Sequence, residues 1–299
     1  MLNTILYDSV YHATPILLCV LGGIFAYKAN VLNISLEGTM MMGAFISVLV
    51  AMFTGSVILG YLSAFAVCLI IGYIFAYMSV RRNGNVIIIG LAINMMVPAV
   101  AGFVLQFMRT PNITLTWINA ADFKLHLPLI KDMPLLGSIL SGHTPITYFA
   151  FFLIFVMMVV MYKTCFGVHV RVVGENEDAA ISLGLRTGRY KIAAILTGSL
   201  CCALAGINLS LERMALYTNN MTSGRGFIAI AAIYCGRGAP GASAVYAIIF
   251  GLARALAVNM GLFAGPAATL FNIIPYIVMV VTLTVVSAVK ARKRHNRGI

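Results

Sequence analysis

A chain of 299 residues with only 9% charged residues, 61% hydrophobic residues and a mean hydropathy of +0.98 is not an ordinary soluble domain. Soluble domains carry roughly 25% charged residues. The formal net charge of +12 would suit nucleic acid in a soluble protein, but the placement of these charges favours a membrane topology instead.

Nine apolar runs follow one another along the chain. They occupy 13–29, 36–53, 58–79, 86–108, 146–163, 189–211, 225–236, 241–260 and 266–289. A helix needs roughly 20 apolar residues to cross a bilayer, so the run at 225–236 is either a re-entrant segment or half of a broken helix. The runs lack the alternating polarity of barrel strands. We therefore expect an all-α polytopic membrane protein, a single domain over 1–299 with about 8–10 transmembrane helices.

Lysine and arginine collect on the cytoplasmic side of membrane proteins. With nine crossings and an outward-facing N-terminus, fourteen lie inside: Lys28, Arg81, Arg82, Lys163, Arg171, Arg186, Arg189, Lys191, Arg237, Lys290, Arg292, Lys293, Arg294 and Arg297. Five lie outside, namely Arg109, Lys124, Lys131, Arg213 and Arg225, and Arg254 lies within a span. The tail at 290–299 is then a cytoplasmic, lipid-facing basic cluster, and we expect no nucleic-acid partner.

The first apolar run has no basic segment before it, and Asp8 precedes it. It therefore predicts a retained first span and not a cleaved signal peptide. The segment 109–145 is the one long external connection; its four prolines and Trp117 suit an interfacial lid with a short helix near 134–141. The five histidines and six cysteines are dispersed, so we expect no metal site and no membrane enzyme.

A charged segment, RVVGENEDAAISLGLRTGRYK (171–191), holds seven of the 28 charged residues between two apolar runs. Glu175, Glu177 and Asp178 suit the first turn of an exposed helix, and Gly184 its C-terminal cap. Ala179, Ala180 and Leu183 share one face by helical spacing. This pattern suits docking into a groove on a partner, and a surface helix that merely connects two spans is the alternative.

The segment Asp178-Ala179-Ala180-x-x-x-Gly184 resembles the EAA-x-x-x-G signature of the permease subunits of ATP-binding cassette importers, with Asp in place of Glu. In that family the segment is the coupling helix, which sits in a cleft of the cytoplasmic ATPase. The resemblance assigns this role to Glu175, Asn176, Glu177, Asp178, Ala179, Ala180, Leu183 and Gly184. The downstream Ile-x-Leu-Pro of the wider family is absent, as in its divergent subgroup.

Three further stretches resemble permeases for branched-chain amino acids, simple sugars and nucleosides, in the same order along the chain. They are ANVLNISLEGTMMMGAF (29–45), LPLIKDMPLLGSIL (127–140) and RGFIAIAAIYCGRGAPGASAVYAIIFGLARAL (225–256). Within that group the chain looks most like nucleoside permeases of the guanosine type, and simple-sugar permeases are the alternative.

This resemblance implies a bacterial cytoplasmic membrane protein with three kinds of partner: an ATPase subunit, a second permease subunit that is identical or similar, and an extracellular substrate-binding lipoprotein. The chain has no Gly-Lys pair and hence no Walker A loop. ATP and Mg²⁺ would therefore be bound by the partner ATPase, with no cofactor on this chain.

Several polar residues within or beside the apolar runs are candidates for the translocation path: Glu37, Asn94, Gln106, Asn208, Arg254 and Asn272. Each has an ordinary structural alternative. Glu37, at the inner end of the second span, suits a gate or an acid at a helix N-terminus, and Arg254 suits the path or snorkelling. The amides suit solute binding or helix packing. Only Glu37 and Glu212 are acids touching spans, which disfavours a stand-alone proton-coupled carrier, the less favoured alternative.

Small residues recur at 38–45, 193–206 and 238–244, where spans would pack closely. The motif GRGAPG (236–241) predicts a tight turn between two helices. Both SLEGTMMMGAF (35–45) and RGFIAIAAIYCG (225–236) pair a polar lead-in with a small, apolar run, a similarity too weak to establish an internal repeat.

Overall fold

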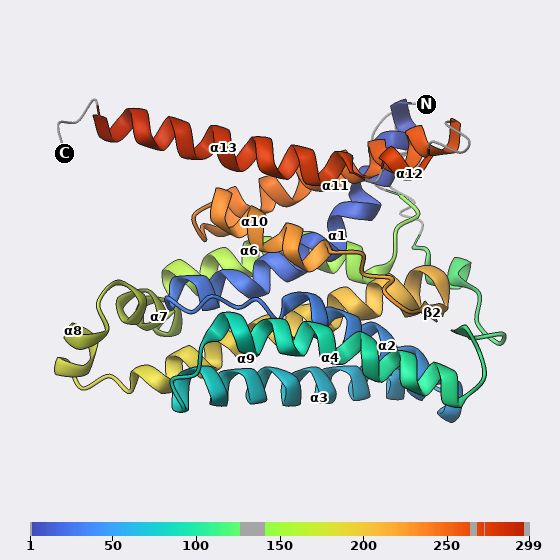
Figure 1. The fold of residues 1–299 in the computed structure, drawn as a ribbon, viewed down its shortest axis with the longest axis horizontal. Coiled ribbons are helices and arrows are strands. Elements are labelled where there is room, and N and C mark those ends of the chain that lie inside the picture. The colour runs from blue at the N-terminus through green and yellow to red at the C-terminus, as the bar shows by residue number, and fades with distance from the viewer. Residues whose placement is uncertain (1, 126–140, 264–267, 272, 296–299) are drawn as a thin grey trace.

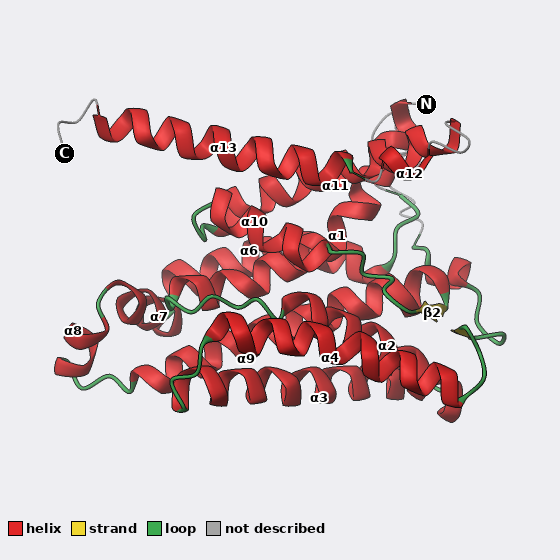
Figure 2. Cartoon of the chain, viewed as in Figure 1, coloured by secondary structure: helices red, strands yellow, loops and turns green. Residues whose placement is uncertain are grey.

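The chain folds into a bundle of helices with two short strands, as Figures 1 and 2 show. The structure is a computed structural model and describes residues 2–125, 141–263, 268–271 and 273–295. The helix expected near 134–141 falls almost wholly outside these ranges, and Asn272 lies outside them. The elements in chain order are α1 (Leu2–Lys28), α2 (Leu36–Thr54), α3 (Val57–Ala76), η1 (Tyr77–Arg81), α4 (Val86–Phe107), β1 (Asn112–Thr114), η2 (Ala120–Phe123), α6 (Pro145–Lys163), α7 (Cys165–Glu175), α8 (Glu177–Ser182), α9 (Thr187–Ile207), η3 (Asn208–Glu212), β2 (Leu216–Thr218), α10 (Arg225–Cys235), α11 (Pro240–Phe263), α12 (Ala268–Phe271) and α13 (Ile274–His295). The expected all-α class is confirmed.

Seven helices in the described ranges are long and apolar enough to cross a membrane: Asn3–Lys28, Leu36–Thr54, Val57–Arg81, Val86–Phe107, Pro145–Lys163, Thr187–Glu212 and Pro240–Gly261. Two shorter apolar helices, Arg225–Cys235 and Ile274–Ala288, account for the other two predicted runs. The first helix begins well before residue 13. Asp8 lies within this helix, where its carboxylate accepts a 2.7 Å hydrogen bond from the Asn259 side chain of α11.

The bundle has two ends, which Figure 1 separates clearly. One end, called the α8 end below, carries α7 and α8 together with Lys28, the connection at 82–85 and the turn at 236–239. The other, called the strand end, carries β1 and β2, which pair antiparallel with Ile113 opposite Tyr217. Helix α13 runs from the strand end toward the α8 end. The segments that charge placement predicts to be cytoplasmic therefore gather at the α8 end.

Helix α9 lies at the centre of the bundle and packs on α1, α2 and α3. Its small residues make this possible. A Cβ added to Gly206 would lie only 2.3 Å from the carbonyl oxygen of Met40 and 2.5 Å from the amide nitrogen of Ala44, both backbone atoms of α2. A Cβ added to Gly22 of α1 would likewise lie only 2.9 Å from the Cα of Gly198. Close backbone approach of this kind drives helix association in lipid, and it confirms the packing role predicted for 193–206.

Helices α2 and α10 both start inside the bundle, and their starts meet. After α1 the chain runs back without helical structure through 31–34, with Asn33 and Ser35 buried, before α2 begins. Helix α10 similarly follows the turns at 219–224. A Cβ added to Gly226 would lie 2.6 Å from the Cα of Glu37, so the two starts touch. These two starts belong to the stretches 35–45 and 225–236, each of which pairs a polar lead-in with a small, apolar run.

This arrangement corrects two expectations from the sequence. Glu37 was expected at the inner end of the second span and Arg225 in an external connection, but both are buried inside the bundle. The reason is that non-helical connections carry the chain partway into the bundle before α2 and α10 begin. The 11-residue length of α10 agrees with the expectation that the run at 225–236 is too short to span alone, as a re-entrant segment or half of a broken helix.

Candidate coupling surface and translocation path

The charged segment forms two helices and not one. Asn176 adopts an extended backbone conformation between α7 and α8, and its side chain accepts a 3.0 Å hydrogen bond from the Ala179 amide. It is therefore the N-cap of α8, with Glu177 and Asp178 in the first turn. Glu175, expected in that first turn, is instead the last residue of α7. The cap interrupts the helix, which spacing alone does not reveal.

The expected apolar face of α8 is partly wrong. Ala179 and Leu183 are exposed, but Ala180 is fully buried and packs inward. Ile181, which the sequence reasoning overlooked, joins Leu183 on the exposed surface, with 55% and 75% of their areas accessible. Two large exposed apolar side chains, one in the six-residue helix α8 and one at its C-cap, suit contact with another protein.

Gly184 caps the C-terminal end of α8, as predicted. Its φ of +79° lies in the left-handed region, and its amide donates a 2.8 Å hydrogen bond to the carbonyl of Ile181. A Cβ added there would meet nothing within 4 Å, so the backbone conformation and not space requires glycine. We call residues 176–184 the α8 surface.

The α8 surface is joined to the bundle at several points. Lys191 of α9 donates a 2.6 Å hydrogen bond to the Glu177 carboxylate, and this bond lowers the pKa of Glu177. Helix α7 packs on α1 and α9, and Gly174 lies directly against the backbone of Lys28. Through these contacts, a displacement of α8 would be transmitted to α1 and α9.

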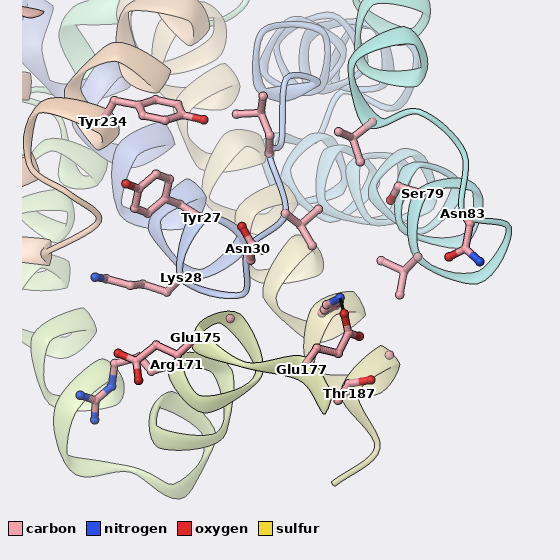
Figure 3. A pocket seen from close by; sticks show the side chains of 17 residues that line it. Tyr27, Lys28, Asn30, Ser79, Asn83, Arg171, Glu175, Glu177, Thr187 and Tyr234 are labelled. Atoms are coloured by element: carbon pink, nitrogen blue, oxygen red, sulfur yellow. Dashed lines mark hydrogen bonds and ion pairs between the residues drawn. The ribbon is translucent and has the colours of Figure 1, made fainter. Parts of the chain in front are cut away.

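A cavity of about 730 Å³ opens beside these contacts at the α8 end. Figure 3 shows its polar lining, in which Lys28 at the end of α1 and Asn30 just after it lie opposite Ser79 and Asn83, with Arg171, Glu175 and Glu177 below. At the strand end the corresponding hollow, lined by Tyr7, Tyr11, Lys124, His143, Glu212 and Arg213 among others, measures about 20 Å³, room for about one water. Of these two cavities among the described residues, the larger therefore lies at the α8 end.

The two amides Asn94 and Asn208 make contacts between elements. Asn94 of α4 accepts a 2.8 Å hydrogen bond from the Gly38 amide and donates a 2.9 Å bond to the Ile34 carbonyl. Asn208, in the π-helical turn that ends α9, donates to Thr144 at 2.8 Å and to Glu212 at 3.0 Å. These contacts favour the helix-packing alternative for both residues.

The remaining path candidates differ widely in their surroundings. The Glu37 carboxylate accepts hydrogen bonds from the amides of Gly224 at 2.8 Å and Gly226 at 2.5 Å, and so joins α2 to the start of α10. Gln106 is exposed near the strand end of α4. Arg254 is half-buried in α11.

Comparison with known proteins assigns the bundle to a family. The model of the family described as "Branched-chain amino acid transport system / permease component" matches residues 5–283. The chain belongs to this family.

Two relatives match nearly the whole chain. "Guanosine ABC transporter permease protein NupQ" of Bacillus subtilis (strain 168) is 30% identical, over 95% of this chain and 92% of its own length. "Nucleoside ABC transporter permease protein NupC" of Lactococcus lactis subsp. cremoris (strain MG1363) is 28% identical, over 94% of this chain and 92% of its own length. "Putative glucose ABC transporter permease protein TsgC13" of Haloferax volcanii is 27% identical, over 84% of this chain and 76% of its own length. No solved structure matches the chain.

Family membership and the apolar helices together make this chain a membrane-embedded permease, a transport subunit of an importer and not an enzyme. Such permeases work with an ATPase and a substrate-binding partner in general.

Proposed function

We propose that this chain lines the translocation path of an ATP-driven nucleoside importer, with purine nucleosides such as guanosine favoured. The two nearly full-length relatives named for nucleoside transport support this substrate class, as do the stretches at 29–45 and 127–140. A simple-sugar importer is the second candidate, supported by the relative named for glucose, which aligns over less of the chain.

The observation that carries the coupling role is the α8 surface. It presents exposed Ile181 and Leu183 beside Glu177 and Asp178 at the tip of the bundle, and it is tied to α9 through Lys191. An ATPase subunit that holds ATP and Mg²⁺ would dock there, and its closure would move α7 and α9 and alternate access to the path.

The same proposal implies an orientation of the chain in the membrane. The α8 end and the basic tail at 290–299 face the cytoplasm, and the N-terminus and the connection at 109–145 face outward, where a binding lipoprotein delivers the solute. The gathering of basic residues at the α8 end supports this orientation. A second permease subunit, identical or similar, completes the transporter.

Uptake of labelled guanosine by cells with and without this gene tests the substrate class. Loss of uptake on deletion, restored by the intact gene and unaffected by unlabelled ribose, is the expected result. Unchanged guanosine uptake in the deletion strain, in cells shown to express the transporter, would contradict the nucleoside proposal and favour the sugar candidate.

A further inference from the structure

The cavity at the α8 end, of about 730 Å³, has the size of a small-molecule site. Such sites measure about 300–1,000 Å³ and combine aromatic rings with a few polar groups. Here the rings are Tyr27 of α1 and Tyr234 of α10, whose centroids lie 5.1 Å apart in an edge-to-face arrangement. Figure 3 shows them on the same side of the cavity as Lys28, Arg171 and Glu175. These five residues, called the cavity group below, come from α1, α7 and α10.

The backbone around the cavity group fixes where its side chains lie. Gly238, in the turn between α10 and α11, has a φ of +64°, and a Cβ added to it would clash with the ring of Tyr27 and lie 3.1 Å from the Cε of Lys28. The turn predicted from GRGAPG therefore packs directly on both side chains. A Cβ added to Gly174 would clash with the carbonyl oxygen of Lys28. Glu175, the next residue, is thereby held where α7 touches the end of α1.

The charged members of the cavity group have no ion-pair partner within the described part of the chain, where the ion pair is that of Lys191 with Glu177. The Nε of Arg171 is buried without a hydrogen-bond partner, and its guanidinium carbon lies 5.3 Å from the centroid of the Tyr162 ring. One carboxylate and two cations therefore line the cavity with hydrogen-bonding capacity that the described chain leaves unused.

The edge of a guanine base is complementary to this arrangement. It carries an acceptor, O6, and two neighbouring N–H donors, at N1 and N2. Two parallel donors match the two oxygens of a carboxylate, and Lys and Arg are donors to guanine O6. Adenine offers the carboxylate a single donor position on this edge, and hypoxanthine lacks the N2 amine. Tyrosine rings provide surfaces on which an unstacked base lies flat. A phosphate group is disfavoured because the Glu175 carboxylate would repel it.

We propose that the cavity group binds the base of a guanine nucleoside. Glu175 accepts hydrogen bonds from N1 and N2, Lys28 or Arg171 donates to O6, and the ring of Tyr27 or Tyr234 lies against the base. This inference rests on the proposed function for the class of solute, and it narrows that class from purine nucleosides to guanine nucleosides. The proposed orientation places the site on the cytoplasmic side, where the solute leaves the permease.

Equilibrium binding of tritiated guanosine to the purified full-length chain in nanodiscs tests the site. We expect saturable binding, with guanosine about tenfold or more tighter than inosine or adenosine as a competitor, because each of these lacks a donor to the carboxylate. Glu175→Gln should weaken guanosine binding about tenfold and remove this preference, and Lys28→Met should weaken it by a similar factor. Asp122→Asn in η2 and Lys163→Met at the end of α6 lie outside the cavity lining and are the matched controls.

The unfolding midpoint separates loss of binding from loss of fold. Glu175→Gln and Lys28→Met should keep the midpoint of the parent chain, because neither side chain forms an ion pair within the described residues. Absence of saturable binding, equal affinity of parent and Glu175→Gln, or an equal loss in the controls would overturn the proposal. Tighter competition by guanosine 5′-monophosphate than by guanosine would also overturn it, because that result would indicate a phosphate site.

Uptake by cells distinguishes failure of this site from failure of the nucleoside proposal. If deletion of the gene abolishes guanosine uptake while Glu175→Gln binds guanosine as the parent does, the nucleoside proposal stands and the cavity site is wrong. If uptake survives the deletion in cells that express the transporter, the nucleoside proposal is wrong, and Glu175-dependent binding to the purified chain would still establish the site.

Discussion

The chain holds its charges in two contrasting regions. On the α8 surface, Glu177 and Asp178 are exposed, and Glu177 forms an ion pair with Lys191 nearby. In the interior, Glu37, Glu212, Arg213 and Arg225 are buried and come from different elements of the chain. Exposed charges cost little to solvate and are available to another protein, whereas buried charges must be satisfied within the bundle. Substitutions should therefore affect stability in the interior and docking on the α8 surface.

The largest loss of stability is expected for Glu37→Ala. It leaves the buried amides of Gly224 and Gly226 without an acceptor, at about 1–3 kcal/mol each, or about 2–6 kcal/mol in total. Thermal unfolding of the purified chain measures this, with Glu37→Gln falling between parent and alanine variant. Glu175→Ala, an exposed acid of α7, is the control and should leave the midpoint unchanged. Equal midpoints for Glu37→Ala and the parent would show that this carboxylate does not hold α2 and α10 together.

Gly206→Val is expected to come next, at about 1–3 kcal/mol, because the side chain would meet the backbone of α2 where overpacking cannot be relieved by a rotamer change. Gly188→Ala is the matched control on the same helix, since its nearest neighbour would be a Val80 methyl at 3.7 Å. The same unfolding assay compares them. If Gly188→Ala were as unstable as Gly206→Val, the loss of stability would not be specific to the close packing at residue 206.

Asn94→Ala separates packing from solute contact. Loss of the bonds to Gly38 and Ile34 should cost about 1 kcal/mol and reduce uptake only in proportion to the protein remaining in the membrane. Uptake per molecule measures the difference, with Gln106→Ala as the exposed comparison. A fall in uptake per molecule at unchanged stability would instead place Asn94 on the path.

The smallest effect is expected for Glu177→Gln, below about 1 kcal/mol because the ion pair is near the surface. Since Lys191 lowers the pKa of Glu177, the stabilisation is fully present above the ordinary pKa of glutamate and is lost as the pH falls through the lowered value. The unfolding midpoints of parent and variant should therefore differ at neutral pH and converge at acidic pH. A difference between the two midpoints that persists or widens in acid would mean that this ion pair is not its cause.

The two regions also differ in how far the sequence predicts them. The apolar runs, the cap at Gly184 and the small face of α9 depend on residues close together in the chain, and spacing reveals them. The N-cap at Asn176 and the burial of Ala180 were missed because they depend on where α7 turns. The meeting of Glu37 with Gly224 and Gly226 could not be predicted, because the residues lie 187 and 189 positions apart and neither connection to their helices is itself helical. The burial of Arg213 and Arg225 was missed for the same reason, because the sequence places each in an external connection.

The central claim is that the α8 surface couples this permease to an ATPase. The most direct test is the ATPase activity that co-purifies with the affinity-tagged chain from its own membranes. Asp178→Lys and Leu183→Asp should remain in the membrane with unchanged unfolding midpoints and lose that activity. Asp122→Lys, a charge reversal near the strand end, should retain it. Full co-purifying activity in both α8 variants would contradict the claim.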